Sequence, residues 1–294
     1  PLPIAGLLSD APLADVIAQS RACNAAAHDL GWKGATPFLT LAFLYIPLVI
    51  VLLYAFSDSI GQAWPIEGYT TKWFGIAWRN PQVREALANS LEVAIIATLF
   101  ALVLGSAAAF AVHRFRFFGR NTVSFLLILP IALPGIVTAI ALNTTINNFQ
   151  IPFGVLTIVI GHATFCIVVV YNNVIARLRR TPTSLVEASM DLGADGWQTF
   201  RYVTFPSIRT AVVAGALLAF ALSFDEIVVT NFTAGSTLTI PKFIYNNVRL
   251  PRNRPVVNVV AVAVILVMFI PVYIAQRMAG GPSETARGRA VAEP

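Results

Sequence analysis

Six long apolar segments, none of which contains a lysine or arginine, are the feature that most constrains the fold of this chain. Each has roughly the 20 residues that a helix needs to cross the ~30 Å hydrocarbon core of a bilayer. A basic residue at the centre of such a helix costs on the order of 2.5–3.5 kcal/mol, so the absence of both types is informative. The segments are residues 37–56, 86–112, 122–146, 152–176, 211–232 and 256–276. They predict an all-α polytopic membrane protein with six transmembrane helices.

The composition excludes the other broad classes of protein. Only 12% of the residues are charged, whereas soluble domains carry about 25%. Disorder requires low hydrophobicity, but 57% of this chain is apolar. Two cysteines exclude a disulfide scaffold. Residues 93–111 lack the alternation of a membrane-spanning strand, which argues against a β-barrel.

The basic residues predict the orientation in the membrane. With both termini in the cytoplasm, thirteen of the 20 lysines and arginines lie inside and seven outside, as the positive-inside rule favours. The net charge of +6 is therefore attributed to topology and not to nucleic acid, and we expect no nucleic-acid partner. The expected organisation is a cytoplasmic tail (1–36), a first span (37–56), a periplasmic loop (57–85), a core of five spans (86–276) and a disordered cytoplasmic tail (277–294). The N-terminal tail lacks signal-peptide features, and residues 13–27 are expected to form a weakly amphipathic helix.

The cytoplasmic loop 177–209 is too long for a simple connection and carries its own helix signals. Pro182 suits the first helical position, and Ser184 to Glu187 have the spacing of a capping box. Gly193 is a typical C-terminal stop. A second short helix follows and is expected to end at Pro206. From the residues alone, this helix pair is either an anchor at the membrane surface or a docking element. Its expected apolar faces consist of Leu185, Ala188, Ser189 and Leu192, and of Trp197, Phe200 and Val203.

The same loop resembles the EAA loop of ABC importer permeases. The family pattern is Glu-Ala-Ala, three residues, Gly, nine residues, Ile, any residue, then Leu-Pro. The chain matches its spacing from Glu187 to Pro206, with Ser189 in place of Ala, Val203 in place of Ile and Phe205 in place of Leu. The resemblance covers residues 89 to about 276 and implies a type I ABC importer permease fold with cytoplasmic coupling helices. The residues that it assigns to ATPase coupling are Glu187, Ala188, Ser189, Asp191, Gly193, Ala194 and Pro206.

The resemblance also implies a set of partners. The sequence contains no Gly-x-x-x-x-Gly-Lys-Ser/Thr motif, so we expect this subunit to have no ATPase site and to be no enzyme. Two separate ATP-binding subunits would use ATP and magnesium, and this subunit would need no cofactor. A second homologous permease, in a heterodimer, would complete the pathway. A periplasmic binding protein would dock on the outer loops 57–85 and 233–255. The expected location of this subunit is the inner membrane of a bacterium.

Two carboxylates in the fifth span suggest what crosses the membrane. Ionisable residues within spans usually face a bundle interior or a water path, and Asp225 and Glu226 are adjacent. Neighbours on a helix point about 100° apart, so we expect one to line the path and the other to bond a neighbouring helix. On a continuous helix, Asp225 shares a face with Val229 and Phe232, and Glu226 with Thr230. The alternative is that both carboxylates merely lock helix packing.

An acidic, aromatic patch suits a cationic substrate, and Phe224 offers a ring for a cation–π contact. Residues 223–235 and 239–246 resemble the second permease of spermidine/putrescine importers, which implies a polyamine. The open alternatives are an ABC permease for an opine, an aminophosphonate, thiamine or ferric ion, and a proton-coupled secondary transporter. The predicted pathway residues are Asp225, Glu226, Phe224, Phe232 and Asn143. Asn143 is expected chiefly to link helices, with a substrate contact as the alternative.

Two further features concern the spans themselves. His162 has no His, Cys or Asp at ligand spacing, so we expect a packing histidine and no metal site. Pro130, Pro134 and Gly135 interrupt the third span and predict a kink. The kink is either a fixed bend or a hinge that moves as the pathway alternates between its two sides.

Overall fold

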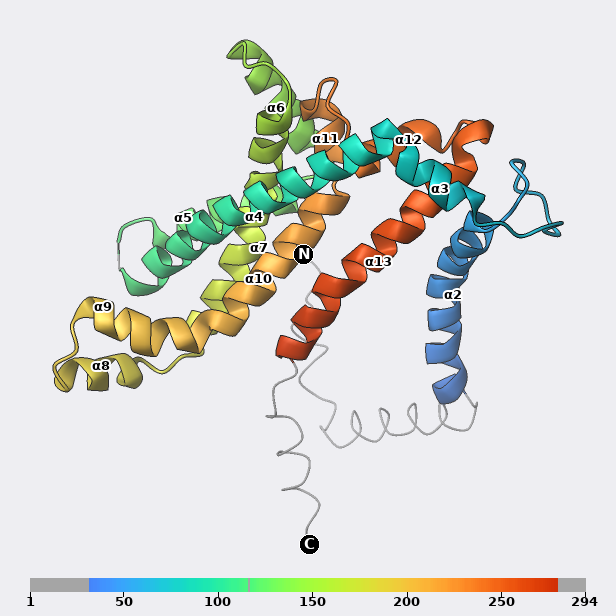
Figure 1. Ribbon diagram of the computed structural model, residues 1–294. Coiled ribbons are helices and arrows are strands. Elements are labelled where there is room, and N and C mark those ends of the chain that lie inside the picture. The colour runs from blue at the N-terminus through green and yellow to red at the C-terminus, as the bar shows by residue number, and fades with distance from the viewer. Residues whose placement is uncertain (1–31, 116, 280–294) are drawn as a thin grey trace, which may run out of the picture. The chain divides into compact units, whose positions relative to one another are not determined.

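The computed structural model describes residues 32–115 and 117–279 (Figure 1). The regular secondary structure of those residues is helical, and their one β contact is an isolated antiparallel bridge between Ser57 and Tyr69, which confirms the all-α prediction. The helix predicted at 13–27 and the C-terminal tail lie outside them. The elements are α2 (Trp32–Ala55), α3 (Lys72–Arg79), α4 (Pro81–Arg114), α5 (Arg120–Ala132), α6 (Gly135–Asn148), α7 (Val155–Leu178), α8 (Thr183–Asp191), α9 (Gly196–Thr199), the π-helix η2 (Phe200–Thr204), α10 (Phe205–Asp225), α11 (Val228–Thr233), α12 (Ile240–Asn247), the 3-10 helix η3 (Pro251–Asn253) and α13 (Arg254–Ala279).

The described part of the chain has five helices long and apolar enough to cross a membrane, or six when the bent pair α5 and α6 counts as one span. The six predicted spans therefore correspond to helices or helix pairs, with shifted ends. The prolines and glycine of the third span do produce a bend: α5 and α6 meet at 101°. Leu133, the residue before Pro134, is extended and ends α5, because a following proline disfavours the helical conformation.

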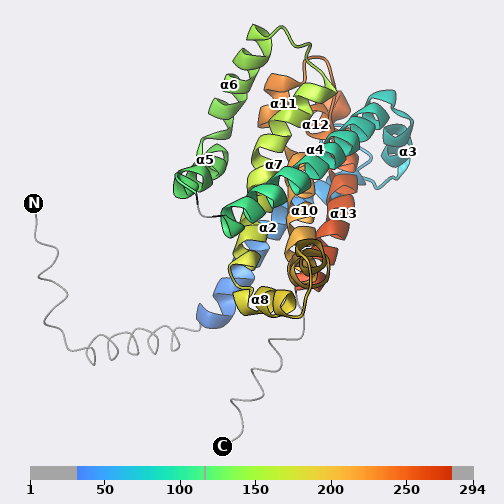
Figure 2. The same cartoon turned by 90° about the vertical axis from the view of Figure 1, so that its left-hand side faces the viewer.

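The chain divides into two compact units, residues 1–54 and 55–294. In the first unit, α2 exposes most of its apolar side chains from Pro37 onward. Such a surface suits lipid or another protein chain. In the second unit, α8 lies at one end and α6, α11 and α12 lie at the other (Figure 2).

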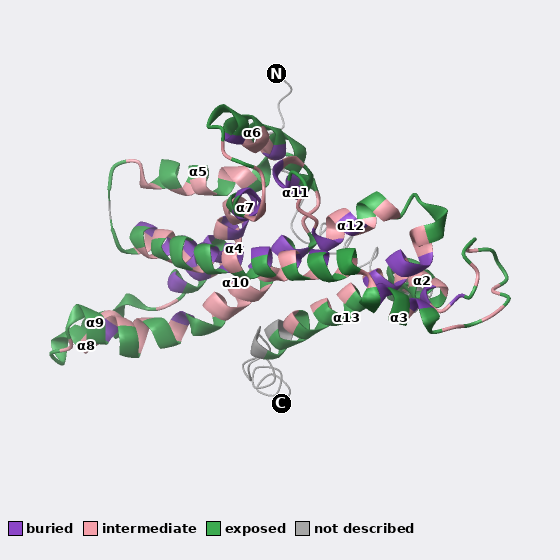
Figure 3. Ribbon diagram, turned by 45° about the horizontal axis from the view of Figure 1, so that its top comes forward, coloured by how far each residue is buried: buried purple, intermediate pink, exposed green. Residues whose placement is uncertain are grey.

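The core of the second unit is built from α4, α7 and α10, which pack on one another. The buried face of α4 carries small residues four apart: Ala97, Ala101, Gly105 and Ala109. Its large apolar side chains, such as Phe100, are exposed, and buried and exposed positions alternate along α4 in Figure 3. Small residues let helices approach closely in a membrane, where lipid is as apolar as a protein core. The packing therefore fits a membrane protein, with its small residues inside.

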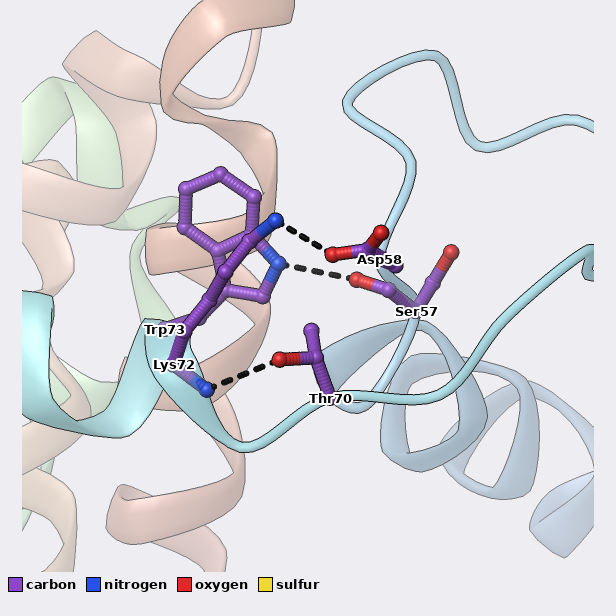
Figure 4. Close-up of polar contacts among 5 residues, drawn as sticks. All are labelled: Ser57, Asp58, Thr70, Lys72 and Trp73. Atoms are coloured by element: carbon purple, nitrogen blue, oxygen red, sulfur yellow. Dashed lines mark hydrogen bonds and ion pairs between the residues drawn. The ribbon is translucent and has the colours of Figure 1, made fainter.

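Within the second unit, polar contacts join the segment before α3 to the first turn of α3 (Figure 4). The Trp73 indole donates a 2.8 Å hydrogen bond to the carbonyl oxygen of Ser57, and Lys72 forms an ion pair with Asp58. The backbone N–H of Lys72 also donates to the Thr70 hydroxyl at 3.2 Å. These contacts lie at the end of the unit opposite α8, on the loop predicted to be periplasmic.

Candidate functional site

The loop predicted to couple to an ATPase folds as two short helices, α8 and α9, joined by a tight bend. Gly193 has φ +87°, in the left-handed region that favours glycine. Its N–H donates to Met190 O at 2.9 Å, and the N–H of Ala194 donates to Ser189 O at 3.1 Å. This is the Schellman arrangement, in which glycine closes a helix. The predicted stop at Gly193 is confirmed.

The predicted capping box of α8 is wrong. The helix begins at Thr183, its N-cap is Pro182, and no side chain caps it. Ser184 is therefore already inside the first turn, where its hydroxyl cannot act as the N-cap. Proline fixes φ near −65°, and the observed −62° with an extended ψ lets Pro182 take the capping position.

A capping box does occur at the start of α9, where the sequence reasoning missed it. The N–H of Gln198 donates to Asp195 Oδ1 at 2.7 Å, and the N–H of Asp195 donates to Gln198 Oε1 at 3.0 Å. The signal was present, since Asp followed three residues later by Gln is the pattern of such a box. This box fixes the direction in which the second helix leaves the bend.

Ser189, which replaces the alanine of the family pattern, joins the two helices. Its hydroxyl donates to Val186 O at 2.7 Å and lies 3.0 Å from the hydroxyl of Thr199. Because the serine proton is used within α8, Thr199 is the donor in the second bond. Thr199 is buried, with 2% of its surface exposed. The substitution therefore adds a hydrogen bond that locks α8 against α9.

Pro206 does not end the second helix, contrary to the prediction. The chain passes from α9 through η2 into α10 without a break, and Pro206 lies in the first turn of α10. The N–H of Phe205 bonds to Phe200 O, five residues back, in the π-helical manner. A proline has no N–H to give to the preceding turn, and the widened turn accommodates that loss. α9 and the fifth span thus share one helical path.

Most of the predicted coupling residues lie on an open surface. Glu187, Ala188, Asp191, Gly193 and Pro206 are exposed, and Ser189 and Ala194 are half-buried. Two large apolar side chains next to the bend are widely exposed: Leu192 at 90% and Trp197 at 66%.

An aromatic contact joins this surface to the core. The Phe200 ring stacks on Trp197 at 5.7 Å and meets Phe110 of α4 edge-on at 5.5 Å. Phe200 of η2 therefore connects Trp197 of the knob formed by α8 and α9 to α4.

The second region is a break in the fifth span at the two carboxylates. α10 ends at Asp225, Glu226 is extended with ψ 115°, and α11 begins at Val228. The continuous helix predicted for 211–232 is therefore wrong. The shared faces expected for Asp225 with Val229 and for Glu226 with Thr230 are lost as well. Two local side-chain bonds, from Thr230 to Glu226 O and from the Val229 N–H to the Glu226 carboxylate, satisfy backbone groups at the break.

The two carboxylates differ in their surroundings. Glu226 is half-buried, and its Oε1 accepts a 3.0 Å hydrogen bond from the N–H of Val229 in the first turn of α11. Its carbonyl oxygen accepts a 2.7 Å bond from the Thr230 hydroxyl. Asp225 is exposed, and within residues 32–115 and 117–279 its carboxylate has no hydrogen bond or ion pair. Glu226 thus bonds to the first turn of α11 across the break, whereas the Asp225 carboxylate is exposed and available to a ligand.

The other predicted pathway residues play different parts. Phe224 is only 2% exposed and packs on Phe220 at 6.0 Å between ring centroids. It has no open face for a cation, so that prediction is wrong. Asn143 on α6 donates a 2.6 Å hydrogen bond to Phe232 O on α11 and thus links two helices, as expected. The Phe232 side chain is half-buried.

His162 on α7 is the packing histidine that the sequence predicts. It is 1% exposed, and its Nδ1 and Nε2 lie 2.8 and 2.9 Å from the hydroxyls of Ser223 and Thr230. These two partners lie on either side of the break. Nothing in the local sequence identified them, because they are 61 and 68 residues away along the chain.

Comparison with known proteins agrees with this architecture. The family described as binding-protein-dependent transport system inner membrane component matches residues 101–280. The adenine deaminase C-terminal domain family matches residues 1–52, of which the structure describes only part of α2. The chain is 16% identical to a bacterial ABC transporter involved in the import of the acidic polysaccharide alginate. The TM-score is 0.67, with 86% of this chain and 97% of that chain covered. At this identity the likeness concerns the fold, which is that of type I ABC importer permeases.

Two curated relatives are more similar in sequence. The chain is 33% identical to the putrescine transport system permease protein PotI of Escherichia coli K12, over 84% of this chain and 91% of that protein. It is 34% identical to the spermidine/putrescine transport system permease protein PotC of the same strain, over 81% of this chain and 90% of that protein. With the family match and the spans, these relatives show that the chain belongs to the binding-protein-dependent inner membrane components, the permease subunits of ABC importers.

Proposed function

We propose that this permease forms half of the pathway for a small organic cation, with a polyamine such as putrescine or spermidine as the substrate. The names of the two relatives support this substrate class. The observation that carries the proposal is the open carboxylate of Asp225 at the end of α10.

The end of α10 suits a cation for two reasons besides the carboxylate. The last four carbonyl groups of a helix lack partners within it, and the helix dipole places partial negative charge there. Transporters use the ends of discontinuous helices to hold cations in the same way. Asp225 adds a full charge at that end, and the ammonium groups of a polyamine complement it.

The position of Asp225 along the span fits a site reached from within the membrane. It lies sixteen residues beyond Arg209, or about 24 Å along the helix axis at 1.5 Å per residue. With Arg209 at the inner end of the span, as the predicted topology has it, this distance would put the carboxylate in the far half of a ~30 Å hydrocarbon core. The proposed site would therefore lie between the middle of the span and its predicted periplasmic end.

The second part of the proposal concerns energy coupling. The knob formed by α8 and α9 would dock on an ATP-binding subunit, with Leu192 and Trp197 as apolar anchors and Glu187 and Asp191 as the acidic rim. The complete importer would contain a second permease, two ATP-binding subunits and a periplasmic binding protein. Both termini of this subunit would lie in the cytoplasm.

A pair of charge-removing variants tests the cation site. In the reconstituted complex, we expect Asp225→Asn to lower polyamine uptake and polyamine-stimulated ATPase activity at least about tenfold. Glu226→Gln is the matched control, because its amide oxygen still accepts the Val229 N–H, and we expect most activity to remain. Normal stimulation in Asp225→Asn, or equal loss in both variants, contradicts the assignment.

A further inference from the structure

The buried imidazole of His162 connects the two halves of the broken fifth span. Its Nδ1 is 2.8 Å from the hydroxyl of Ser223, in the last turn of α10. Its Nε2 is 2.9 Å from the hydroxyl of Thr230, on α11. The ring comes from α7, which packs against both helices. One side chain from a third helix thus holds both ends of the break.

The hydrogen bonds assign the tautomer of this ring. The single proton of the Thr230 hydroxyl is donated to Glu226 O at 2.7 Å, so Thr230 must accept from His162. Nε2 therefore carries the proton. In a neutral imidazole the other nitrogen is an acceptor, so Ser223 donates to Nδ1. The result is one directed chain of hydrogen bonds from Ser223 through His162 and Thr230 to the Glu226 carbonyl.

This chain ends on the residue next to Asp225. It fixes the Glu226 carbonyl, and the Glu226 carboxylate in turn caps Val229. α11 is also held at its far end, where Thr157 of α7 donates to Thr233 O at 2.7 Å. The first turn of α11 and the last turn of α10 are both hydrogen-bonded to His162, through Thr230 and Ser223. Losing that anchor leaves the Ser223 hydroxyl, 3% exposed, without its acceptor and the Thr230 hydroxyl, 0% exposed, without its donor, although Thr230 still donates to Glu226 O.

We infer that His162 is a positioning residue for the cation site: it holds α10 and α11 apart at a fixed separation and so fixes the direction in which the Asp225 carboxylate points. The inference rests on the proposed function for the role of Asp225, but the geometry of the break is independent of that role. His162 itself touches no substrate, since it is 1% exposed.

The test compares His162→Gln with His162→Leu. Glutamine supplies one acceptor and one donor, whereas leucine supplies neither. The geometric readout is the labelling rate of Asp225→Cys by a small water-soluble maleimide, in a chain with Cys23 and Cys166 replaced by alanine. Amounts of assembled complex are measured in parallel. We expect His162→Leu to change the labelling rate at least fivefold per assembled complex, and His162→Gln to restore the original rate.

The functional readout uses the native Asp225. We expect His162→Leu to raise the putrescine concentration for half-maximal ATPase stimulation, and His162→Gln to reverse that change. A labelling change without a change in putrescine response supports the positioning role and rejects Asp225 as the cation site. Labelling rates that agree among the wild-type, Gln and Leu forms overturn the inference, as does an equal change in both variants. If His162→Leu does not assemble, Ser223→Ala removes only the bond to α10, and an unchanged labelling rate there likewise overturns it.

Discussion

The close contact between α4 and α7 can be tested by one added methyl group. A Cβ on Gly105 would lie 2.8 Å from Ile167 O, 3.0 Å from Val170 Cβ and 3.2 Å from Tyr171 N. Two of these atoms are backbone, so no side-chain rotation relieves the contact. Reaching the 3.4 Å of an ordinary contact requires the helices to separate by about 0.6 Å, and gaps of that size forfeit a quarter or more of the local dispersion energy.

Overpacking of this kind costs about 1–3 kcal/mol, against a gain of about 1 kcal/mol from the higher helix propensity of alanine. For Gly105→Ala we therefore expect a net loss of about 1–2 kcal/mol. At roughly 2–4 °C per kcal/mol, the melting temperature of the complex in detergent should fall by about 2–8 °C. Gly75→Ala on α3 is the control, because no atom lies within 4 Å of its added Cβ. Equal melting temperatures for the two variants would refute the close packing of α4 on α7.

Three further predictions concern the two candidate regions. Gly161→Ala places a methyl group 2.7 Å from Val229 Cγ1; we expect it to displace α11 and lower polyamine uptake while assembly, followed by size-exclusion chromatography, stays normal. Ser189→Ala leaves the buried Thr199 hydroxyl without its acceptor; we expect fewer solute molecules imported per ATP hydrolysed, and no such change for the exposed Ser184→Ala. Asp195→Ala removes the cap of α9, which is worth about 1 kcal/mol; amide exchange at residues 196–199 should accelerate about fivefold, and unchanged exchange would contradict the capping role.

The existence of the spans, though not their exact ends, could be predicted from sequence because local physics decides it. Apolar runs must be helical in lipid, the residue before Pro134 must leave the helix, and Gly193 suits a left-handed turn. The capping box failed for a local reason too. Two stretches of the loop have the required pattern, at Ser184 and at Asp195. Because Pro182 is the N-cap of α8, Ser184 lies inside that helix, and only the stretch at Asp195 forms a capping box.

The break at Glu226 could not be predicted from its neighbourhood. Neither glycine nor proline occurs between Phe224 and Phe232, so local rules favour a continuous helix. Local bonds of Glu226 and Thr230 cap the break, but the bonds that join its two sides come from His162, which is far away in sequence. The burial of Phe224 likewise depends on packing between helices, which its local sequence does not reveal. In this chain, tertiary contacts therefore help to hold the break that leaves Asp225 free and Glu226 bonded.

The continuity of the helix that carries the free carboxylate bears on coupling. From Gly196 to Asp225 the chain is one helical path of 30 residues, or about 45 Å at 1.5 Å per residue. The π-turn at η2 keeps Pro206 within it, and Phe200 packs it on α4. A displacement of the knob formed by α8 and α9 should therefore reach Asp225 as a rigid-body movement. Asn143 and Thr157 hold α11 to α6 and α7, and His162 keeps its separation from the end of α10. Under the proposed function, movement of the knob should therefore shift the Asp225 carboxylate and α11 together, so that the cation site moves as one unit.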